Sequence, residues 1–432
     1  MQTGRNTITS IISLLLILLL FNNCGGSEKK QGSGNGNIPE PDKSTYDVEF
    51  TDITVVIEKD IMESFISSDK KSGVYKFKND ADDLLDLKPG EIVFFYGNSV
   101  RRVNNVVEDG GEIIVNTEYV TLNEAIKNGT IGWENKIDWS SDQAEVQNAS
   151  LLIGDELFAA QETSEFKIHY EGKIQGWDIS LDLVPKNNKL TIDITGTKSI
   201  AGQKVCTISG KGFISQFTNE CHFRFADSNL ESFEMVNHGL NGELELKFAA
   251  VGLGSQIAQL EIPAKIRIPT RIYGIPVSFN LGCNLKIFPE VGEGASSQAS
   301  YKIIYDSDMG FKFANNTAEA TSKLNSHNME VTGETVSAGV ITTGVGVGLE
   351  FPRIEVAVLG EIIVPYFLYN TSVITFYEPG IASNLPPCQE GKMTIKCVSG
   401  IDLQFFGASY AFSKDHFEKV RKWQTEGSQC ED

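Results

Sequence analysis

Apolar and polar side chains alternate along most of the chain from about residue 165 onward. The alternation is clear in residues 177–183 (WDISLDL), 244–248 (LELKF), 265–268 (KIRI) and 277–281 (VSFNL). Successive side chains of a β-strand point to opposite faces of its sheet, so each run can bury one face and leave the other in water. The pattern therefore predicts an all-β fold of long antiparallel strands, arranged as a sandwich or an elongated sheet, with only minor short helices.

The chain before this region has shorter, more punctuated segments. Residues 100–116 contain two strand-like runs joined through Asp109 and Gly110, and an Asp-Gly pair is typical of a tight hairpin turn. The sequence Thr-Leu-Asn-Glu at 121–124 has the pattern of a helical capping box, which predicts a short helix near 122–128. We therefore expect a small β-rich module over residues 46–140.

The remaining residues, 141–432, are expected to form one large antiparallel β domain. Two weakly helical segments interrupt its strand pattern, at 142–160 and at 414–423. In the second, Phe417, Val420 and Trp423 recur every three residues, which favours one face of a helix.

The N-terminus has the pattern of an export signal. Arg5 lies in an otherwise uncharged start, and residues 11–21 are almost entirely Leu and Ile. This apolar run is shorter than the roughly 20 residues that a membrane-spanning helix needs. Residues 1–23 are therefore predicted to be a signal peptide. Residues 24–45, rich in Gly, Ser and Pro, are predicted to be a flexible tether.

Cys24 directly follows the apolar run and resembles the lipid-modified cysteine of bacterial lipoproteins. Phe21 and Asn23 depart from the residues that usually precede that cysteine. The resemblance implies that Cys24 carries fatty acyl chains and becomes the first residue of the mature protein. Because Gly25 is not the Asp that typically retains lipoproteins at the inner membrane, the outer membrane is the expected location. The alternative is an ordinary signal peptide with an incidental cysteine.

Three further segments resemble a module of large uncharacterised bacterial surface proteins. They are the turn LKPGEIV at 87–93, the basic strand RRV at 101–103, and the stretch from Thr117 to Ile126 with its TLNEA sequence. Segments 268–285 and 351–369 resemble the long β-rich body that follows this module. The resemblance implies a non-catalytic role at the cell surface and supplies no site residues.

Six cysteines remain after Cys24, and an even number in an exported protein indicates disulfides. They are Cys206, Cys221, Cys283, Cys388, Cys397 and Cys430. Six cysteines allow 15 pairings, so the connectivity stays open. Short spacing favours Cys206–Cys221 and Cys388–Cys397, which would leave Cys283–Cys430.

Composition argues against several functions. The chain has 37 Lys and Arg against 57 Asp and Glu, a net charge of −20, which disfavours nucleic acid as a partner. Its five His show no metal-ligand spacing, and the nearest match to a nucleophile elbow, at 407–411, lacks the final Gly. We therefore expect no enzyme activity, catalytic residues, metal site or cofactor. The acidic segments 80–86 and 306–308 are solvated loops or, as an alternative, calcium ligands.

The expected function is recognition or adhesion at the cell surface, through an unknown protein or glycan ligand, by a protein held to the outer membrane by its lipid. Aromatic residues such as Trp133 or Trp139 would suit such a ligand if exposed, although aromatic residues of this kind more often belong to a core or to cross-strand pairs. The alternative is an envelope carrier, facing the periplasm, that holds a lipid or other apolar ligand between its long sheets. A hydrolase with a site assembled from distant residues is a third hypothesis.

The lipid anchor predicts a simple outcome. Replacing Cys24 by Ala should release the protein from membranes and abolish its labelling by a fatty-acid probe. The control is Cys430→Ala, which removes a cysteine far from the anchor and should leave both unchanged. Membrane fractionation with metabolic labelling measures both effects, and unchanged membrane association of Cys24→Ala would contradict the lipoprotein interpretation.

Overall fold

The computed structural model describes residues 43–140, 149–154, 156–159, 167–252, 259–321, 323–339, 342–358, 362–379, 387–408 and 410–424. These residues belong to one compact unit. Cys24, Cys430, the signal peptide and nearly all of the tether lie outside the described residues.

The largest sheet has twelve strands and is organised around β16 (Asn229–Val251). One edge of β16 pairs first with β15 (Phe217–Ala226) and then with β14 (Gln203–Ser215). The other edge pairs along almost its whole length with β19 (Ser296–Ala314). A single long strand thus joins three groups of strands into one sheet.

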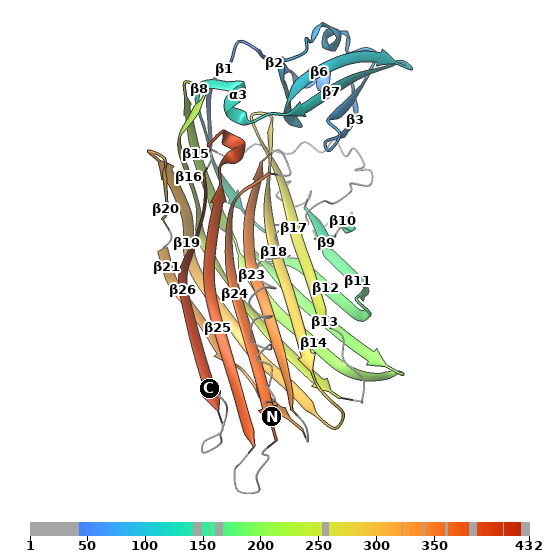
Figure 1. Cartoon of the computed structure of the whole chain (residues 1–432), viewed down its shortest axis with the longest axis vertical. Helices are drawn as coiled ribbons and strands as arrows, with labels where there is room; N and C mark the ends of the chain where they lie inside the picture. Colours follow the sequence, from blue (N-terminus) through green and yellow to red (C-terminus); the bar gives the residue numbers. More distant parts are fainter. Residues whose placement is uncertain are drawn as a thin grey trace, which may run out of the picture. The chain divides into compact units, whose positions relative to one another are not determined.

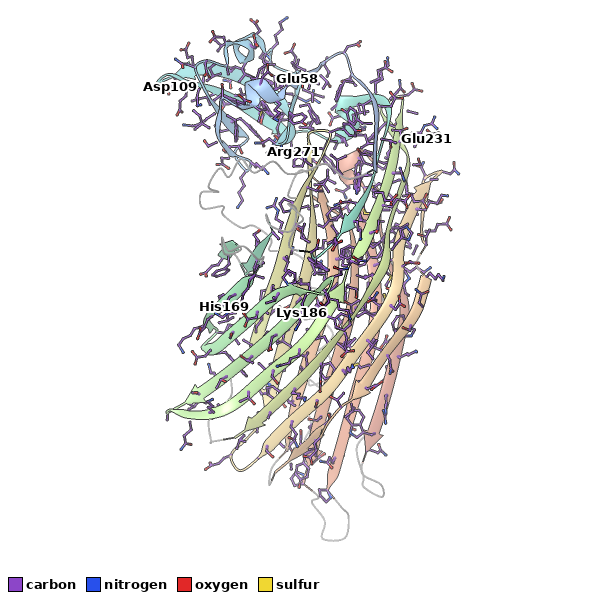
Figure 2. The ribbon with its side chains drawn as sticks, turned by 180° about the vertical axis from the view of Figure 1, so that it is seen from behind. Glu58, Asp109, His169, Lys186, Glu231 and Arg271 are labelled. Carbon is purple, nitrogen blue, oxygen red and sulfur yellow. The ribbon has the colours of Figure 1, made fainter. Side chains whose placement is uncertain are left out.

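The other strands of this sheet continue from those three neighbours (Figure 1). They are β1 (Lys43–Phe50), β8 (Ile126–Ile137), β11 (Ile168–Ile174), β12 (Trp177–Lys186), β13 (Lys189–Ile200), β20 (Thr317–Ala320), β21 (Lys323–Val331) and β22 (Val336–Ala338). Side chains of β11 and β12 also pair on the outer face, where His169 lies 3.0 Å from Asp182 (Figure 2).

A second sheet has eight strands and lies face to face with the first (Figure 1). In spatial order its strands are β10 (Glu156–Ala159), β9 (Ser150–Ile153), β17 (Leu260–Ile272), β18 (Ile275–Glu290), β23 (Thr343–Val358), β24 (Ile362–Glu378), β25 (Cys388–Asp402) and β26 (Ala411–Gln424). Inward side chains of both sheets form one continuous apolar core. The all-β prediction is confirmed.

A third, six-stranded sheet carries its own small core around Tyr75, Phe77 and Phe95. Its strands in spatial order are β2 (Thr54–Ile57), β5 (Ile92–Phe95), β6 (Ser99–Asp109), β7 (Glu112–Tyr119), β4 (Val74–Lys78) and β3 (Phe65–Asp69). The predicted hairpin is confirmed as β6 and β7. The sheet is narrower than the module expected over 46–140, because β1 and β8 pair with each other and β8 joins β15 of the twelve-stranded sheet.

Helices are few and short among the described residues: α2 (Lys59–Met62), α3 (Leu122–Ala125), and the 3₁₀ turns η1 (Asp82–Asp86) and η2 (Gln404–Phe406). The predicted capping box of α3 is confirmed, with the Thr121 amide donating to Glu124 Oε2 at 3.0 Å. This helix ends after one turn, because β8 begins at Ile126.

Strand ends at the six-stranded sheet and the eight-stranded sheet contact each other. The Gly97 amide donates to the Gly274 carbonyl at 2.5 Å. Arg271, near the end of β17 (Figure 2), packs against Gly97. A Cβ added at Gly97 would lie 3.2 Å from the Arg271 Nε. The small sheet is therefore joined to the sandwich by backbone and side-chain contacts as well as by β1 and β8.

Different contacts close the two ends of the apolar interior. Near the start of β16, Phe406 packs against the rings of Phe223 and Phe233. Near the end of β16, the Ser337 hydroxyl lies 2.8 Å from the hydroxyl of Ser297 in one sheet and 2.6 Å from that of Thr375 in the other. The core is thus closed by aromatic packing at one end and by hydroxyl hydrogen bonds at the other.

The helix expected at 414–423 is wrong, because these residues form part of β26 and pair with β25. Pairing at the sheet edge outweighs a weak helical spacing, and Val420 is 47% exposed on the strand. The helix expected at 142–160 is wrong for 150–153 and 156–159, which form β9 and β10. Residues 141–148 lie outside the described residues.

The expected disulfide pairs are also wrong, because Cys206, Cys221, Cys283 and Cys397 are free thiols. Cys206 lies opposite Ala250 and Cys221 opposite Met235, 15 positions apart on β16 (250 − 235), which is roughly 50 Å of strand.

The pair expected within the C-terminal region fails for a similar reason. Cys388 and Cys397 lie on one strand, β25, nine positions apart (397 − 388), or roughly 30 Å. A disulfide needs Cα atoms within about 7 Å. Cys388 is not among the free thiols.

Candidate functional site

One interruption in the regular pairing of the eight-stranded sheet lies in the middle of β23, where it affects both neighbouring strands. Gly282 of β18 pairs with Arg353 and Asn284 pairs with Glu350, so Cys283 lies opposite two residues, Phe351 and Pro352. The same two residues interrupt the pairing of β23 with β24. One extra residue in β23 therefore makes a bulge against both of its neighbours, and bulges of this kind locally disrupt the ladder of hydrogen bonds.

An apolar cavity lies between the two large sheets at this bulge. Its walls come from both inner faces and include Leu181, Leu183, Ile192, Ile194, Leu244 and Leu246 of the twelve-stranded sheet, and Leu151, Ile262, Ala264, Ile266, Leu281, Cys283, Leu285, Leu349 and Phe351 of the eight-stranded sheet. About 40 Å³ of it is wide enough for the centre of a water molecule. A cavity with hydrocarbon walls stays dry and accepts apolar molecules.

The cavity is smaller than an engineered apolar cavity of about 150 Å³ that binds benzene. A ligand larger than a few carbon atoms must therefore displace part of the wall. The wall at Cys283 and Phe351 is the part that the bulge frees from regular pairing. Displacing that wall would break fewer hydrogen bonds between strands than displacing a regularly paired segment.

The cavity contains a free thiol, Cys283. Burial, with a smaller contribution from the charge of Glu350, raises the pKa of Cys283 to about 12. The thiol is therefore neutral at physiological pH and lacks the nucleophilic thiolate form. It behaves as a small apolar side chain in the cavity wall.

Two buried tyrosines, one on β19 and one on β24, lie next to the cavity residue Phe351 or to each other. Tyr305 is 1% exposed, and its ring lies edge-on to the cavity residue Phe351, with 6.3 Å between the ring centroids. Tyr369 of β24 packs against Tyr305 and donates a hydrogen bond to Ser307 Oγ at 3.2 Å. Burial raises the pKa of both tyrosines well above its usual value, so both hydroxyls remain protonated.

A buried carboxylate braces the outer side of the same strands. The Glu355 side chain is 3% exposed, with Lys265 Nζ 2.8 Å from Oε2 and Arg353 Nε 2.6 Å from Oε1. Burial by itself raises the pKa of Glu355, but the two cations outweigh it and hold the pKa below its usual range. Because Lys265 is on β17 and Glu355 on β23, this cluster ties two strands together across β18 beside the bulge.

Tryptophans predicted as core or binding residues belong to the core. Trp133 and Trp139 are 3% and 0% exposed. The Trp133 indole donates to Asn219 Oδ1 at 2.8 Å, and the Trp139 indole donates to the Ser215 carbonyl at 3.1 Å. They are therefore not available to an external ligand.

Histidines that are distant in sequence meet acidic or hydroxyl partners on the strands. His222 and His238 lie 3.1 and 3.3 Å from the two carboxylate oxygens of Glu220 on the outer face. His416 Nε2 lies 2.5 Å from the Ser399 hydroxyl. Glu220 and His222 are two residues apart on β15, whereas the contacts of His238 and His416 join different strands and depend on strand register, which the sequence does not reveal.

The Ser399–His416 pair has the residue types of a nucleophile and its base. Ser399 is completely buried, so a substrate has no access to its hydroxyl. Burial and the charge of Lys414 lower the pKa of His416, which keeps the ring neutral at neutral pH. The pair is an internal hydrogen bond of the fold. Within the described ranges, no group of three or more His, Cys, Asp or Glu is arranged to hold a metal ion.

Comparison with known protein families finds a match to the N-terminal part only. Residues 34–128 match the model of DUF8403, a domain of unknown function, which covers less than a quarter of the 432-residue chain. No curated protein matches the chain, and no solved structure matches it. The match agrees with the expected resemblance of the small module to uncharacterised proteins. In the part of the chain that the structure describes, no helix is long and apolar enough to cross a membrane.

The Glu355 cluster predicts a pH-dependent loss of stability. A carboxylate whose pKa is lowered by folding stabilises the fold above its unfolded pKa of about 4.3, and this contribution is lost as the pH falls through the lowered value. Glu355→Gln should cost about 1.5–3 kcal/mol near pH 7, because it removes charge-assisted hydrogen bonds. The difference from the native chain should narrow between pH 5 and pH 3 in urea unfolding. Glu171→Gln, at an exposed glutamate, is the matched control. If the difference in unfolding free energy between Glu355→Gln and the native chain were the same at pH 5 and pH 3, the stabilising role of the Glu355 carboxylate would be contradicted.

Proposed function

We propose that this chain is a lipid-anchored protein of the bacterial outer membrane that binds a small apolar ligand, without catalysis, in the cavity between its two large sheets. The observation that supports an apolar ligand is the composition of the cavity walls, which are almost entirely hydrocarbon. The proposed anchor is Cys24, which lies outside the described residues.

The polar side chains at and beside the cavity favour binding of a ligand over catalysis. Cys283 is neutral, and the Tyr305 hydroxyl stays protonated. The charged residues Lys265 and Glu355 engage each other on the outer side of the sheet. The binding free energy of a ligand in the cavity comes mainly from removing its apolar surface from water, at about 25 cal/mol for each Å² buried. Such a protein would store or carry its ligand in the envelope.

The Ala264 side chain offers a test, because it lines the cavity and leaves room beside it. Ethylbenzene should raise the unfolding midpoint of the native chain, since a ligand that binds only the folded state stabilises it. Ala264→Leu places extra bulk in the cavity and should abolish that rise. Thr394→Leu adds a similar side chain on the outer face of β25 and should preserve it.

Two results would contradict this proposal. The first is the absence of any shift with ethylbenzene in the native chain. The second is an equal shift in the native chain and in Ala264→Leu, because ethylbenzene would then bind elsewhere.

Recognition of a protein or glycan at the cell surface is a second candidate function. Phe288 and Ile374 are 45% and 47% exposed on the outer face of the eight-stranded sheet. They flank Gly346, where an added Cβ would lie 3.8 Å from Phe288 and 3.9 Å from Ile374. Exposed aromatic and aliphatic side chains around bare backbone favour contact with an external partner.

Protease treatment of intact cells separates the two locations. Surface recognition predicts digestion of the chain while a periplasmic control protein survives. A carrier that faces the periplasm predicts protection until the outer membrane is opened. Immunoblotting of both proteins before and after permeabilisation gives the answer.

A further inference from the structure

The inward residues of β19 form the border of the apolar cavity. Tyr305 lies opposite Gly242, and the next inward residue of β19, Ile303, lies opposite Leu244. Leu244 lines the cavity, and Phe351 lines it from the other sheet. Tyr305 is thus next to cavity residues on both sides of the core.

The hydroxyl of Tyr305 occupies space that a glycine leaves open. A Cβ added at Gly242 would lie 2.2 Å from this oxygen, so the phenol ring extends across β16 over that glycine. Gly242 is followed on the same face by Leu244. The hydroxyl therefore lies over Gly242, one inward position along β16 from the cavity residue Leu244.

This hydroxyl is buried and has no hydrogen-bond partner among the residues that the structure describes. A buried hydroxyl without a partner is costly, and native proteins usually satisfy such groups. The neighbouring Tyr369 is satisfied in the usual way, because its hydroxyl donates a hydrogen bond to Ser307 Oγ. Tyr305 is therefore a hydrogen-bond donor that the described part of the fold does not use.

Charge at the site excludes an anionic ligand group. The one basic residue at the cavity, Lys265, has its Nζ 2.8 Å from Glu355 Oε2, where it balances a buried carboxylate. A carboxylate brought against Tyr305 would lack a cation, and an unpaired buried charge costs far more than a neutral group. The ligand group that meets Tyr305 must be neutral and must accept a hydrogen bond.

We propose that the cavity takes an uncharged ligand with a hydrocarbon body and one carbonyl oxygen, a ketone or an ester, which accepts the O–H of Tyr305. This inference rests on the proposed function and adds the chemical class of the ligand. A pure hydrocarbon would leave the hydroxyl unsatisfied, and a fatty acid anion would bury a charge.

Ethylbenzene and acetophenone test the proposal, because they share a carbon skeleton and differ by one carbonyl oxygen. Their dissociation constants are measured by calorimetry on the native chain, on Tyr305→Phe and on the control Tyr369→Phe. Tyr305→Phe should raise the dissociation constant of acetophenone by about three- to ten-fold, as expected for the loss of one hydrogen bond. It should leave the dissociation constant of ethylbenzene unchanged. Tyr369→Phe should leave the ratio of the two constants unchanged, because its hydroxyl already bonds to Ser307.

Unfolding without ligand gives a second measurement. Tyr305→Phe should unfold at the same or a higher midpoint than the native chain, because it removes a hydroxyl that has no partner. Tyr369→Phe should unfold at a lower midpoint, because it leaves Ser307 without its hydrogen bond.

The results separate the two proposals. Failure of the native chain to bind ethylbenzene would overturn the apolar cavity as a binding site. Binding of ethylbenzene with the same ratio of constants in the native chain and Tyr305→Phe would overturn only the role of the carbonyl. A lower midpoint for Tyr305→Phe without ligand would also overturn that role, because the hydroxyl would then have a partner in the fold.

Discussion

The packing of two apolar sheet faces against each other is the interaction on which the rest of the structure depends. It is possible because β16 holds β14, β15 and β19 in one sheet, so that inward residues of all four strands meet the eight-stranded sheet. In such a sandwich each strand contributes every second side chain to the core. Where a strand gains one residue this alternation shifts, and the bulge at Phe351 is such a place.

The cavity lies at that shift. A regular ladder would carry the inward pattern of β23 through to its end, and side chains of both sheets would interlock. The extra residue breaks the match at Cys283, and both Cys283 and Phe351 line the space between the sheets. Glu355 lies on the outer side, where its contacts with Lys265 and Arg353 hold β17 and β23 in place around the interrupted pairing. The apolar packing around the cavity thus lies on the inner face of these strands, and the ion pairs of Glu355 lie on their outer face.

Local patterns predicted the features that short stretches of chain determine. Alternation indicated the long strands, and Thr121 to Glu124 indicated the start of α3. Features that depend on which strands become neighbours were not predictable. Cys206 and Cys221 are close in sequence, but they pair with opposite halves of β16. The cavity and the unpartnered Tyr305 depend in the same way on register between strands more than 60 residues apart, since Tyr305 lies opposite Gly242.

Aromatic side chains repeatedly lie over glycines of a neighbouring strand. Tyr366 covers Gly400, Trp423 covers Gly391, and Tyr305 covers Gly242. Such pairs compensate for the missing side chain of a glycine in a strand. Tyr366 is only half-buried, so solvent can reach part of its side chain, and Arg353 lies over its ring. Tyr305 makes the same contact inside the core, where water does not satisfy its hydroxyl. The aromatic side chain that covers Gly242 therefore also places beside the cavity residues a buried hydroxyl that has no partner among the described residues, and a carbonyl ligand would supply its acceptor.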